Sequence, residues 1–276
     1  MADKLQTQRI ENKYIIDEQL APPIGDFVRS YLVDDEFNNP ELSNSYYVNS
    51  LYIDNPGLDL CHATLQGEKN RYKLRIRFYD EKPESPVFFE VKQRVNKIIQ
   101  KQRAMVRREV ADDLLLTKRF PVASDLVRPR DGKALGALRR FFELQESIGA
   151  VGTVFVSYLR EAYVSMASND VRVTFDRAIK ARPFQGTINM PEVIRPIDIC
   201  DVVRTNGRVR ASDLSEPLVL ELKYTDRFPN WMNDMVAHFN LDLGSMPKYV
   251  GCVNEIHKHT LGSPIPLMNA LRTEMI

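Results

Sequence analysis

The chain has 276 residues, of which 43% are hydrophobic and 27% are charged, a composition typical of a soluble globular protein. Its 38 Lys and Arg residues are balanced by 37 Asp and Glu residues, so it lacks the global positive field that favours nucleic-acid binding. No apolar run approaches the roughly 20 residues of a membrane-spanning helix, and residues 1–8 lack the apolar core of a signal peptide. We therefore expect a cytoplasmic protein that binds no nucleic acid and does not insert directly into a membrane.

The first part of the sequence predicts two strands and two helices. Residues 9–16 and 46–54 have the alternation and the β-branched and aromatic content of strands. Apolar residues recur at helical spacing over residues 18–32, and we expect this helix to begin near Pro23, because proline fits the first turn of a helix. A short helix is expected over residues 58–65.

The middle of the sequence predicts an antiparallel meander covered by helices. Residues 71–80 and 86–94 form a predicted hairpin, and a further strand runs to about Arg108. The connections are too short to hold crossover helices, so these strands should be antiparallel. Helices are predicted over residues 111–119 and 133–147, and they should pack on the outside of the sheet.

The last part of the sequence predicts three strands and two helices. Residues 151–166 and 171–176 should form another hairpin, whereas residues 191–212 carry only weak strand signals and are not assigned. The remaining predicted elements are a strand over residues 218–224 and helices over residues 229–239 and 248–257.

These elements alternate without a repeat or a clear linker. We therefore predict one α+β domain over residues 1–276, in which an antiparallel sheet is covered by helices on its outside. Its core should span about residues 9–258, and residues 262–276, which are interrupted by prolines, should form a loosely ordered tail.

Several familiar chemistries have no motif in this sequence. The three cysteines, Cys61, Cys200 and Cys252, lack paired spacing and are expected to be reduced thiols. The sequence contains no P-loop, no G-x-G-x-x-G, no H-R-D loop and no Gly-x-Ser-x-Gly elbow. Any anion site must therefore come from charges gathered by the fold.

One pattern, charged–apolar–charged, recurs in separate strand-like segments. Side chains two residues apart on a strand share one face, so each segment places its charges on one face and an apolar residue on the other. The segments are Arg9-Ile10-Glu11-Asn12-Lys13, Lys73-Leu74-Arg75-Ile76-Arg77, Glu90-Val91-Lys92, Lys101-Gln102-Arg103, Tyr158-Leu159-Arg160 and Glu221-Leu222-Lys223.

A solvated sheet face would be the plain explanation of any one of these segments. As a set, however, they carry large apolar residues that need burial under helices, and their charged face is mostly positive. Cations packed together need an anion, and the planar fork of arginine matches phosphate geometry. The cations are Arg9, Lys13, Lys73, Arg75, Arg77, Lys92, Lys101, Arg103, Arg160, Arg172 and Lys223, against Glu11, Glu90, Asp176 and Glu221.

The three glutamates of the pattern each stand two residues before a lysine. Glu11, Glu90 and Glu221 could form ion pairs with neighbouring cations within the sheet. Alternatively, one or two of them could hold Mg²⁺ or Mn²⁺, because hard divalent cations prefer carboxylate oxygens together with substrate phosphates. The sequence leaves both interpretations open.

The ordered series of motifs resembles the vacuolar transporter chaperone (VTC) domain, a polyphosphate polymerase family among the triphosphate tunnel metalloenzymes of the CYTH-like superfamily. The likeness begins at Arg9-Ile10-Glu11-Asn12-Lys13-Tyr14 and spans about residues 9 to 250. It continues through Ser50-Leu51-Tyr52-Ile53-Asp54, Lys73 to Arg77, Phe89 to Lys92, Lys101 to Arg103, Tyr158 to Arg160, Val173 to Asp176, Leu220 to Tyr224, Pro229-Asn230-Trp231 and Pro247-Lys248-Tyr249.

The resemblance implies an antiparallel β-barrel that forms a tunnel, and a polymerase that transfers the γ-phosphoryl group of ATP to inorganic polyphosphate with Mn²⁺ or Mg²⁺. Glu221 is then the expected metal ligand. The residues expected to be catalytic are Lys13, Arg75, Arg77, Lys92, Arg160 and Lys223. The residues expected to contact the substrate are Arg9, Glu11, Lys73, Glu90, Lys101, Arg103, Tyr158, Arg172 and Lys248.

Two positions depart from related patterns. Hydrolytic tunnel enzymes carry E-x-E-x-K at the first strand, and Arg9 replaces the first glutamate here, which resembles the polymerase branch. Pro247 replaces a serine of the family, which removes one expected phosphate hydrogen bond.

Two alternatives stay open. One is a tunnel triphosphatase that hydrolyses inorganic triphosphate or nucleoside triphosphates, and the other is a non-catalytic polyphosphate-binding module. The family's frequent regulatory and membrane domains are not found in this sequence, so we expect no product export through this chain alone, whereas a membrane protein remains a possible partner.

Overall fold

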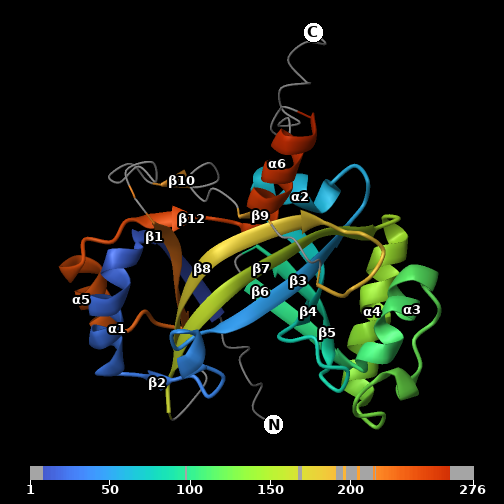
Figure 1. Cartoon of the computed structure of the whole chain (residues 1–276), viewed down its shortest axis with the longest axis horizontal. Helices are drawn as coiled ribbons and strands as arrows, with labels where there is room; N and C mark the ends of the chain where they lie inside the picture. The colour runs from blue at the N-terminus through green and yellow to red at the C-terminus, as the bar shows by residue number, and fades with distance from the viewer. Residues whose placement is uncertain are drawn as a thin grey trace. The chain divides into compact units, whose positions relative to one another are not determined.

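The structure is a computed structural model that describes residues 9–96, 98–166, 170–190, 195–196, 204–205, 214 and 216–261 (Figure 1). The chain divides into two compact units. Unit 1 comprises Met1–Tyr47, Tyr158–Ile179 and Asp198–Met246, and unit 2 comprises Val48–Ser157, Lys180–Ile197 and Pro247–Ile276. Each unit has its own hydrophobic core.

The strands of unit 1 pair around β11 (Pro217–Thr225), which lies between β1 (Arg9–Asp17) and β8 (Arg172–Pro183). Both pairings are antiparallel, and they place Lys13 opposite Glu221 and Glu221 opposite Thr174. The strand order is β10-β12-β1-β11-β8-β7, with β10 (Arg204–Thr205), β12 (Leu243–Ser245), β7 (Val151–Val164) and β2 (Val33–Asp34), which pairs with β7.

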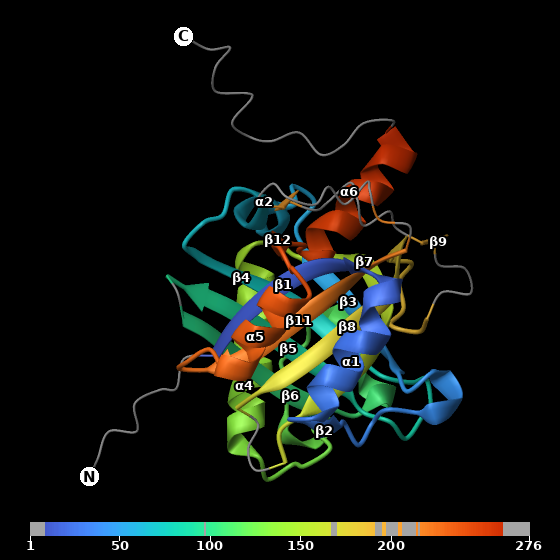
Figure 2. The same cartoon turned by 90° about the vertical axis from the view of Figure 1, so that its left-hand side faces the viewer.

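Two helices cover one face of these strands. Figure 2 shows α1 (Ala21–Arg29) and α5 (Asn230–His238) lying across β1, β11 and β8. Ile24 and Val28 of α1 are fully buried, and they belong to the same core as Leu220 and Leu222 of β11. The apolar residues of the strands thus face the helices, which leaves the charged residues of the same strands on the opposite face.

Unit 2 is built on an antiparallel meander. The strands β3 (Tyr46–Asp54), β4 (Asn70–Phe78), β5 (Val87–Val95) and β6 (Ile98–Val106) pair in chain order. Strand β7 lies beside β3 at the other edge. The short β9 (Arg195–Pro196) pairs with the end of β8.

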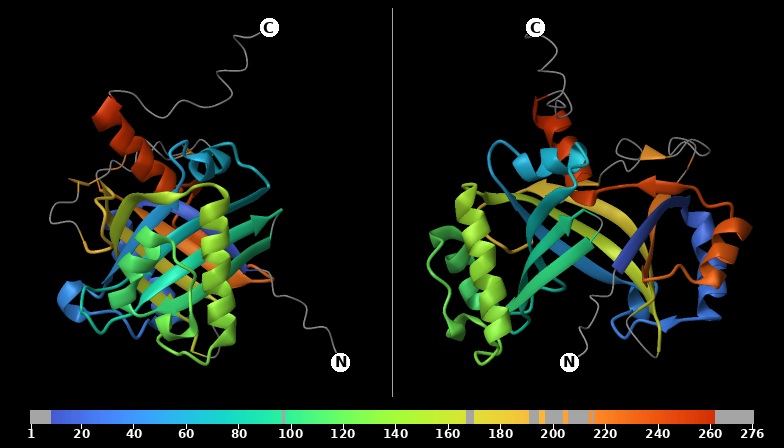
Figure 3. Two further views of the ribbon diagram at one scale, coloured as in Figure 1. Left: turned by 90° about the vertical axis from the view of Figure 1, so that its right-hand side faces the viewer. Right: turned by 180° about the vertical axis from the view of Figure 1, so that it is seen from behind.

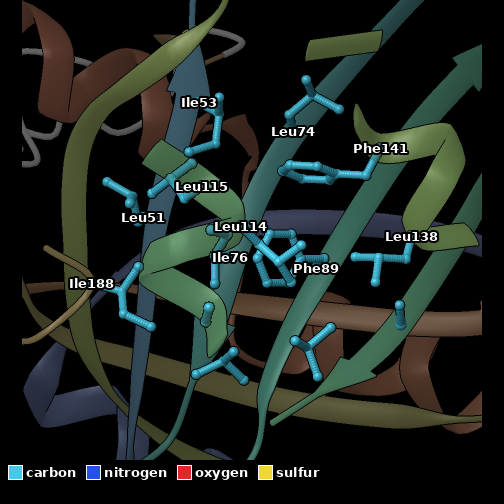
Figure 4. Close-up of a cluster of buried hydrophobic side chains, with 14 of the residues drawn as sticks. Leu51, Ile53, Leu74, Ile76, Phe89, Leu114, Leu115, Leu138, Phe141 and Ile188 are labelled. Atoms are coloured by element: carbon cyan, nitrogen blue, oxygen red, sulfur yellow. The ribbon is translucent and has the colours of Figure 1, made fainter. Parts of the chain in front are cut away.

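The core of unit 2 lies between the meander and two helices. Figure 3 shows α3 (Ala111–Thr117) and α4 (Gly132–Ser147) against one face of β4, β5 and β6. Leu74, Ile76 and Phe89 point toward Leu114, Leu138 and Phe141 in the close-up of this core (Figure 4), and all six side chains are buried.

A buried carboxylate joins two further helices of unit 2 to β3. Asp54, at the end of β3, accepts hydrogen bonds from the backbone N–H groups of Leu60 and Cys61 in α2 (Asp59–Leu65) at 3.1 and 3.0 Å. The same carboxylate accepts a bond of 2.6 Å from the hydroxyl of Tyr249 in α6 (Lys248–Leu261). Asp54 therefore fixes the first turns of both helices relative to the sheet.

Most predicted strands and helices are confirmed within one to three residues. The first helix begins at Ala21, two residues before the predicted start, and ends at Arg29, three residues before the end of the predicted apolar pattern. A 3₁₀ turn at residues 18–20 precedes it, and its prolines lie in its first turn, as predicted. Further 3₁₀ turns lie at Pro40–Leu42, Arg108–Val110 and Ala123–Asp125.

Two predicted elements end too early. Strand β8 continues to Pro183 rather than Asp176, and Ala178 within it adopts a φ of 49°. Helix α6 continues to Leu261 rather than His257.

Other predictions stay untested. The unassigned segment 191–212 lies largely outside the described residues, as do the predicted tail and Cys200. The single domain and the closed barrel also remain predictions. Within the described ranges, no helix combines the length and the apolar character needed to cross a membrane.

Candidate functional site

The pairing register of the strands brings charged side chains of unit 1 together around Glu221. Lys13, Glu221 and Thr174 lie in one row across β1, β11 and β8, and Glu11 and Lys223 lie opposite each other in the next row. Because alternate residues of a strand share a face, the two rows lie on the same side of the sheet. We call Glu11, Lys13, Arg160, Asp176, Glu221 and Lys223 the Glu221 cluster.

Three cations contact the carboxylate of Glu221. Lys13 Nζ lies 3.1 Å from Oε1, and Lys223 Nζ donates to Oε2 at 2.5 Å. Arg160 Nη2 donates to Oε2 at 3.2 Å, and the hydroxyl of Thr174 donates at 3.4 Å. The side chain of Glu221 is only 5% exposed, so these contacts offset the cost of burying its charge.

The second carboxylate of the cluster orients Arg160. Its Nε and Nη2 donate to the two carboxylate oxygens of Asp176, each at 2.7 Å, in a bidentate fork. The guanidinium lies 5.3 Å from the ring centroid of Tyr158, which stands two residues earlier on β7. Both Arg160 and Asp176 are buried, so the fork fixes the direction in which the remaining donors of Arg160 point.

The two lysines beside Glu221 have different protonation energetics. Burial disfavours the charged form of both, but Glu221 and Glu11 outweigh it for Lys13 and raise its pKa above the ordinary value. For Lys223, burial is reinforced by the charge of Arg160 and lowers the pKa to about 8, against the opposing effect of Glu221. The surroundings therefore favour the charged form of Lys13 and disfavour the charged form of Lys223.

A second cluster of charges lies in unit 2, around Glu90. Arg75, Glu90 and Arg103 occupy one row across β4, β5 and β6. Arg75 donates to Glu90 through Nε at 2.7 Å and Nη2 lies 2.6 Å away; Lys101 Nζ lies at 2.6 Å and Arg103 Nε at 3.2 Å. Together with Arg77, whose Nε donates to Ser50 at 3.2 Å, these residues form the Glu90 cluster.

A row of lysines lies next to the Glu90 cluster. Lys73, Lys92 and Lys101 face one another across β4, β5 and β6, one register step along the charged face from Arg75, Glu90 and Arg103. Like charges directly opposite on neighbouring strands repel each other. An anionic ligand at this face would relieve that repulsion.

The positive charge around Glu90 also sets its protonation. Burial favours the neutral acid, but Arg75, Arg77 and Lys101 outweigh it and hold the pKa of Glu90 well below its usual range. The pKa of Lys101 falls to about 7, because burial and the charges of Arg75 and Arg77 outweigh the attraction of Glu90. The same crowding of positive charge therefore stabilises ionised Glu90 and disfavours the charged form of Lys101.

Two predicted site residues lie apart from both clusters, and the side chain of a third lies outside the described residues. Arg172 donates to Asp35 at 2.7 Å and to the hydroxyl of Tyr46 at 2.8 Å, although it stands opposite Lys223 in the register. Lys248 is buried at the start of α6. The side chain of Arg9 lies outside the described residues.

Some residues of the two clusters' surroundings were not predicted as site residues, although they lie in motifs of the family resemblance. Tyr52 joins the row of Arg75 in β3, and its hydroxyl accepts from Arg75 at 3.5 Å while its ring stacks on Tyr249 at 4.7 Å. Through Tyr249 this contact continues to Asp54. The period-two parity of strands could have identified Ser50, Tyr52 and Thr174 as face-sharing residues, but only the register shows their partners.

The donor chemistry of the Glu221 cluster fits a divalent cation bound jointly with phosphate. Across the described residues, no group of three or more His, Cys, Asp and Glu side chains has the arrangement of a protein-only metal site. Magnesium-type ions in phosphoryl-transfer sites usually take one or two carboxylates and complete their shell with substrate phosphates and water. Glu221, with Glu11 beside the same Lys223, could supply such a partial shell.

Comparison with known proteins identifies one family. The family model of the VTC domain matches residues 8–257. No curated protein matches the chain.

Two solved structures resemble the chain weakly. The PH1819 protein from Pyrococcus horikoshii OT3 shares 12% identity, with coverage of 88% of this chain and 96% of that one and a TM-score of 0.38. The mimivirus capping enzyme triphosphatase shares 7% identity, with coverage of 83% and 87% and a TM-score of 0.28. Both scores are low, so neither likeness carries weight for the fold or the function.

Proposed function

The chain belongs to the VTC domain family, and on this premise we propose that it is a metal-dependent polyphosphate polymerase that takes the γ-phosphoryl group from ATP. Polyphosphate or triphosphate is the substrate class, and Mn²⁺ or Mg²⁺ is the metal. The antiparallel barrel tunnel implied by the resemblance stays part of this proposal, and a structure with tripolyphosphate bound would test it.

The excess of cations in the Glu90 cluster is the observation that carries the proposal. Four cations, Arg75, Arg77, Lys101 and Arg103, accompany one carboxylate, and Lys73 and Lys92 extend the positive face. A chain of phosphates carries a negative charge on every unit, and arginine forks match its oxygens. The spacing of these side chains over three adjacent strands suits an extended polyanion better than a single small anion.

The proposed reaction needs no general base. A terminal oxygen of the polyphosphate chain, ionised at neutral pH, attacks the γ-phosphorus of ATP, the bond between the γ-phosphorus and the β,γ-bridging oxygen breaks, and ADP leaves with that oxygen. The chain grows by one phosphate. Most of the rate acceleration must then come from alignment of the two phosphate ends and from neutralisation of their repulsion.

The Glu221 cluster is proposed to serve the reacting phosphates. Lys13 and Arg160 would bind the β- and γ-phosphoryl oxygens, and the Asp176 fork keeps Arg160 aimed. Glu221 would hold the divalent metal, which when bound neutralises charge on the phosphates. On ligand binding, the lysines that now contact Glu221 would exchange part of this contact for phosphate oxygens.

Incubation of the purified chain with ATP and Mn²⁺ tests the proposal, with the products separated on a gel that resolves polyphosphate. We expect long acid-labile chains together with ADP, and at least about a hundredfold less of both products with Glu221→Gln. A matched control, Glu143→Gln, changes an exposed glutamate of α4 and should keep full activity. Release of orthophosphate without chains would replace the proposal with the triphosphatase, and binding of polyphosphate without turnover would replace it with the binding module.

A further inference from the structure

One surface segment of this nearly neutral chain carries a local excess of positive charge. Residues 118–140 contain seven Lys or Arg and two Asp, a net charge of +5, whereas the whole chain has a net charge of +1. The segment lies in unit 2 and connects α3 to α4, including most of α4 (Figure 3). It contains none of the residues of the Glu221 and Glu90 clusters.

The two carboxylates of this segment are already engaged. Asp125 is buried and receives both terminal nitrogens of Arg119, at 3.0 and 2.7 Å. Asp131 accepts from the backbone N–H of Ala134 at 2.8 Å and caps α4. The charge that faces solvent is therefore positive, and it is carried by Lys118, Arg128, Arg130, Lys133 and Arg139, all of which are exposed.

Large apolar side chains are exposed beside these cations. Phe120 is 68% exposed, Leu116 is 54% exposed, and Val122 and Val127 are exposed as well. The guanidinium of Arg139 lies 4.7 Å from the ring centroid of Phe120, so these two side chains share one surface. We call Leu116, Phe120, Val122 and Val127, with the five exposed cations, the basic–apolar surface.

Hydrogen bonds hold the loop that presents Phe120. The buried Asp125 accepts from the backbone N–H of Val122 at 2.8 Å, and its own carbonyl accepts from Arg107 at 2.9 Å. Val127 N–H donates to the carbonyl of Met105 in β6 at 3.1 Å. These bonds fix the backbone of residues 122–127 beside the end of β6.

We propose that the basic–apolar surface binds an anionic lipid bilayer. The cations attract the negative surface of such a membrane, and the phenylalanine and leucine enter the boundary between headgroups and acyl chains. The cations would also attract a soluble polyanion, but the apolar side chains would add nothing to its affinity. Proteins that bind single-stranded nucleic acid stack its bases on several aromatic side chains, whereas the aromatic side chain exposed on this surface is Phe120.

Sedimentation of the full chain with lipid vesicles tests the proposal. We expect binding to vesicles of phosphatidylcholine with phosphatidylglycerol, binding that falls as salt rises, and at least about tenfold weaker binding to phosphatidylcholine alone. Phe120→Ser should weaken binding several-fold, and the pair Arg128→Glu and Arg130→Glu should abolish it. Circular dichroism and the melting temperature of each variant verify that it is folded.

Matched controls separate this surface from charge and apolarity in general. Phe37→Ser changes an equally exposed phenylalanine of unit 1, and Lys180→Glu with Arg227→Glu changes net charge by the same amount elsewhere. Neither control should alter vesicle binding.

Three outcomes would overturn the proposal. The first is equal binding of the chain to neutral and to anionic vesicles, and the second is an equal loss of vesicle binding in the control variants. The third is that the original protein binds no vesicles while Arg128→Glu/Arg130→Glu loses tripolyphosphate binding, which would make the surface a polyanion site. The vesicle assay needs no ATP or metal, so its result is independent of the polymerase assay.

Discussion

The Glu221 and Glu90 clusters use the same residue types in different proportions. The Glu221 cluster combines three carboxylates, Glu11, Asp176 and Glu221, with the cations Lys13, Arg160 and Lys223. The Glu90 cluster combines one carboxylate with four cations.

The difference suggests a division of labour. A cluster with equal numbers of carboxylates and cations can accept a metal ion and still neutralise phosphates, because its carboxylates attract the metal ion and its cations attract the phosphates. A cluster with excess positive charge is suited to hold a polyanion and would repel a metal ion. We therefore expect chemistry to depend on Glu221 and chain binding to depend on the cations around Glu90.

The largest expected effect is on turnover. Glu221→Gln should lower polyphosphate synthesis about a hundred- to a thousandfold, because the proposed metal loses its charged ligand. Tripolyphosphate binding in the absence of metal should change by less than about threefold, since the neighbouring cations remain. Turnover and the calorimetric binding constant, measured on the same preparation, check this prediction. Equal losses of turnover and of binding would contradict the proposed division of roles between the two clusters.

The next effect is on stability, at Glu90. Glu90→Gln leaves Arg75, Lys101 and Arg103 without their shared carboxylate and should lower the free energy of unfolding by about 3 kcal/mol. Tripolyphosphate at a hundred times its dissociation constant should restore about 2.7 kcal/mol. Urea unfolding with and without the ligand measures both quantities. The exposed Glu143→Gln should keep the stability of the original protein and should gain about 2.7 kcal/mol from the ligand as well, because its binding site is unchanged. A failure of the ligand to stabilise Glu90→Gln would contradict the binding role.

Arg160 tests the orientation of the Glu221 cluster. Arg160→Lys keeps the charge but loses the fork to Asp176, so the free energy of unfolding should fall by about 2 kcal/mol. Arg140→Lys changes an exposed arginine paired with Glu143 and should be nearly neutral. Denaturant midpoints of the two variants provide the comparison, and similar midpoints would show that the fork contributes little.

Lys101 gives the Glu90 cluster a pH dependence. Its pKa is about 7 in the folded protein and 10.5 when unperturbed, so between these values the unfolded chain binds more protons and this residue favours folding more as pH rises. Bound phosphate favours the charged form, so binding should take up a proton above pH 7. Affinity should accordingly fall by up to about tenfold as pH rises through this window.

Calorimetry in buffers of different ionisation enthalpy measures this proton uptake. Lys101→Arg keeps the positive charge without a titration in this range, so the variant should bind tripolyphosphate without the uptake. An unchanged uptake in Lys101→Arg would assign it to another group.

The smallest expected effect concerns Tyr249, whose ring stacks on Tyr52, the tyrosine that accepts a hydrogen bond from Arg75. Tyr249→Phe removes the hydroxyl that donates to Asp54 but keeps the ring that stacks on Tyr52. The free energy of unfolding should fall by about 1 to 2 kcal/mol, because Asp54 is buried. Tyr47→Phe, at an exposed tyrosine, is the control for thermal melts, and equal melting temperatures would show that the bond is dispensable.

Strand parity predicted which residues share a face, and the structure confirms this for β4. Leu74 and Ile76 are buried under α3 and α4, while Arg75 between them contacts Glu90 on the other face. Parity depends only on the local geometry of a strand, so the sequence alone is sufficient for it.

Register and long-range contacts could not be predicted in this way. Nothing local to Lys73 indicates that Lys92 and Lys101 lie opposite it, and Asp54 meets Tyr249 across 195 residues of chain. The continuation of β8 beyond Asp176 was likewise not predicted. These features depend on how strands pair, which a pattern within one strand does not encode.

Anomalous scattering from crystals grown with tripolyphosphate and Mn²⁺ tests the central distinction most directly, because it locates the metal and the phosphates in one measurement. We predict a manganese peak coordinated by Glu221, with phosphate oxygens on Lys13 and Arg160 and further phosphates on Arg75, Lys101 and Arg103. A manganese peak at Glu90, or phosphates that leave both clusters untouched, would contradict the account.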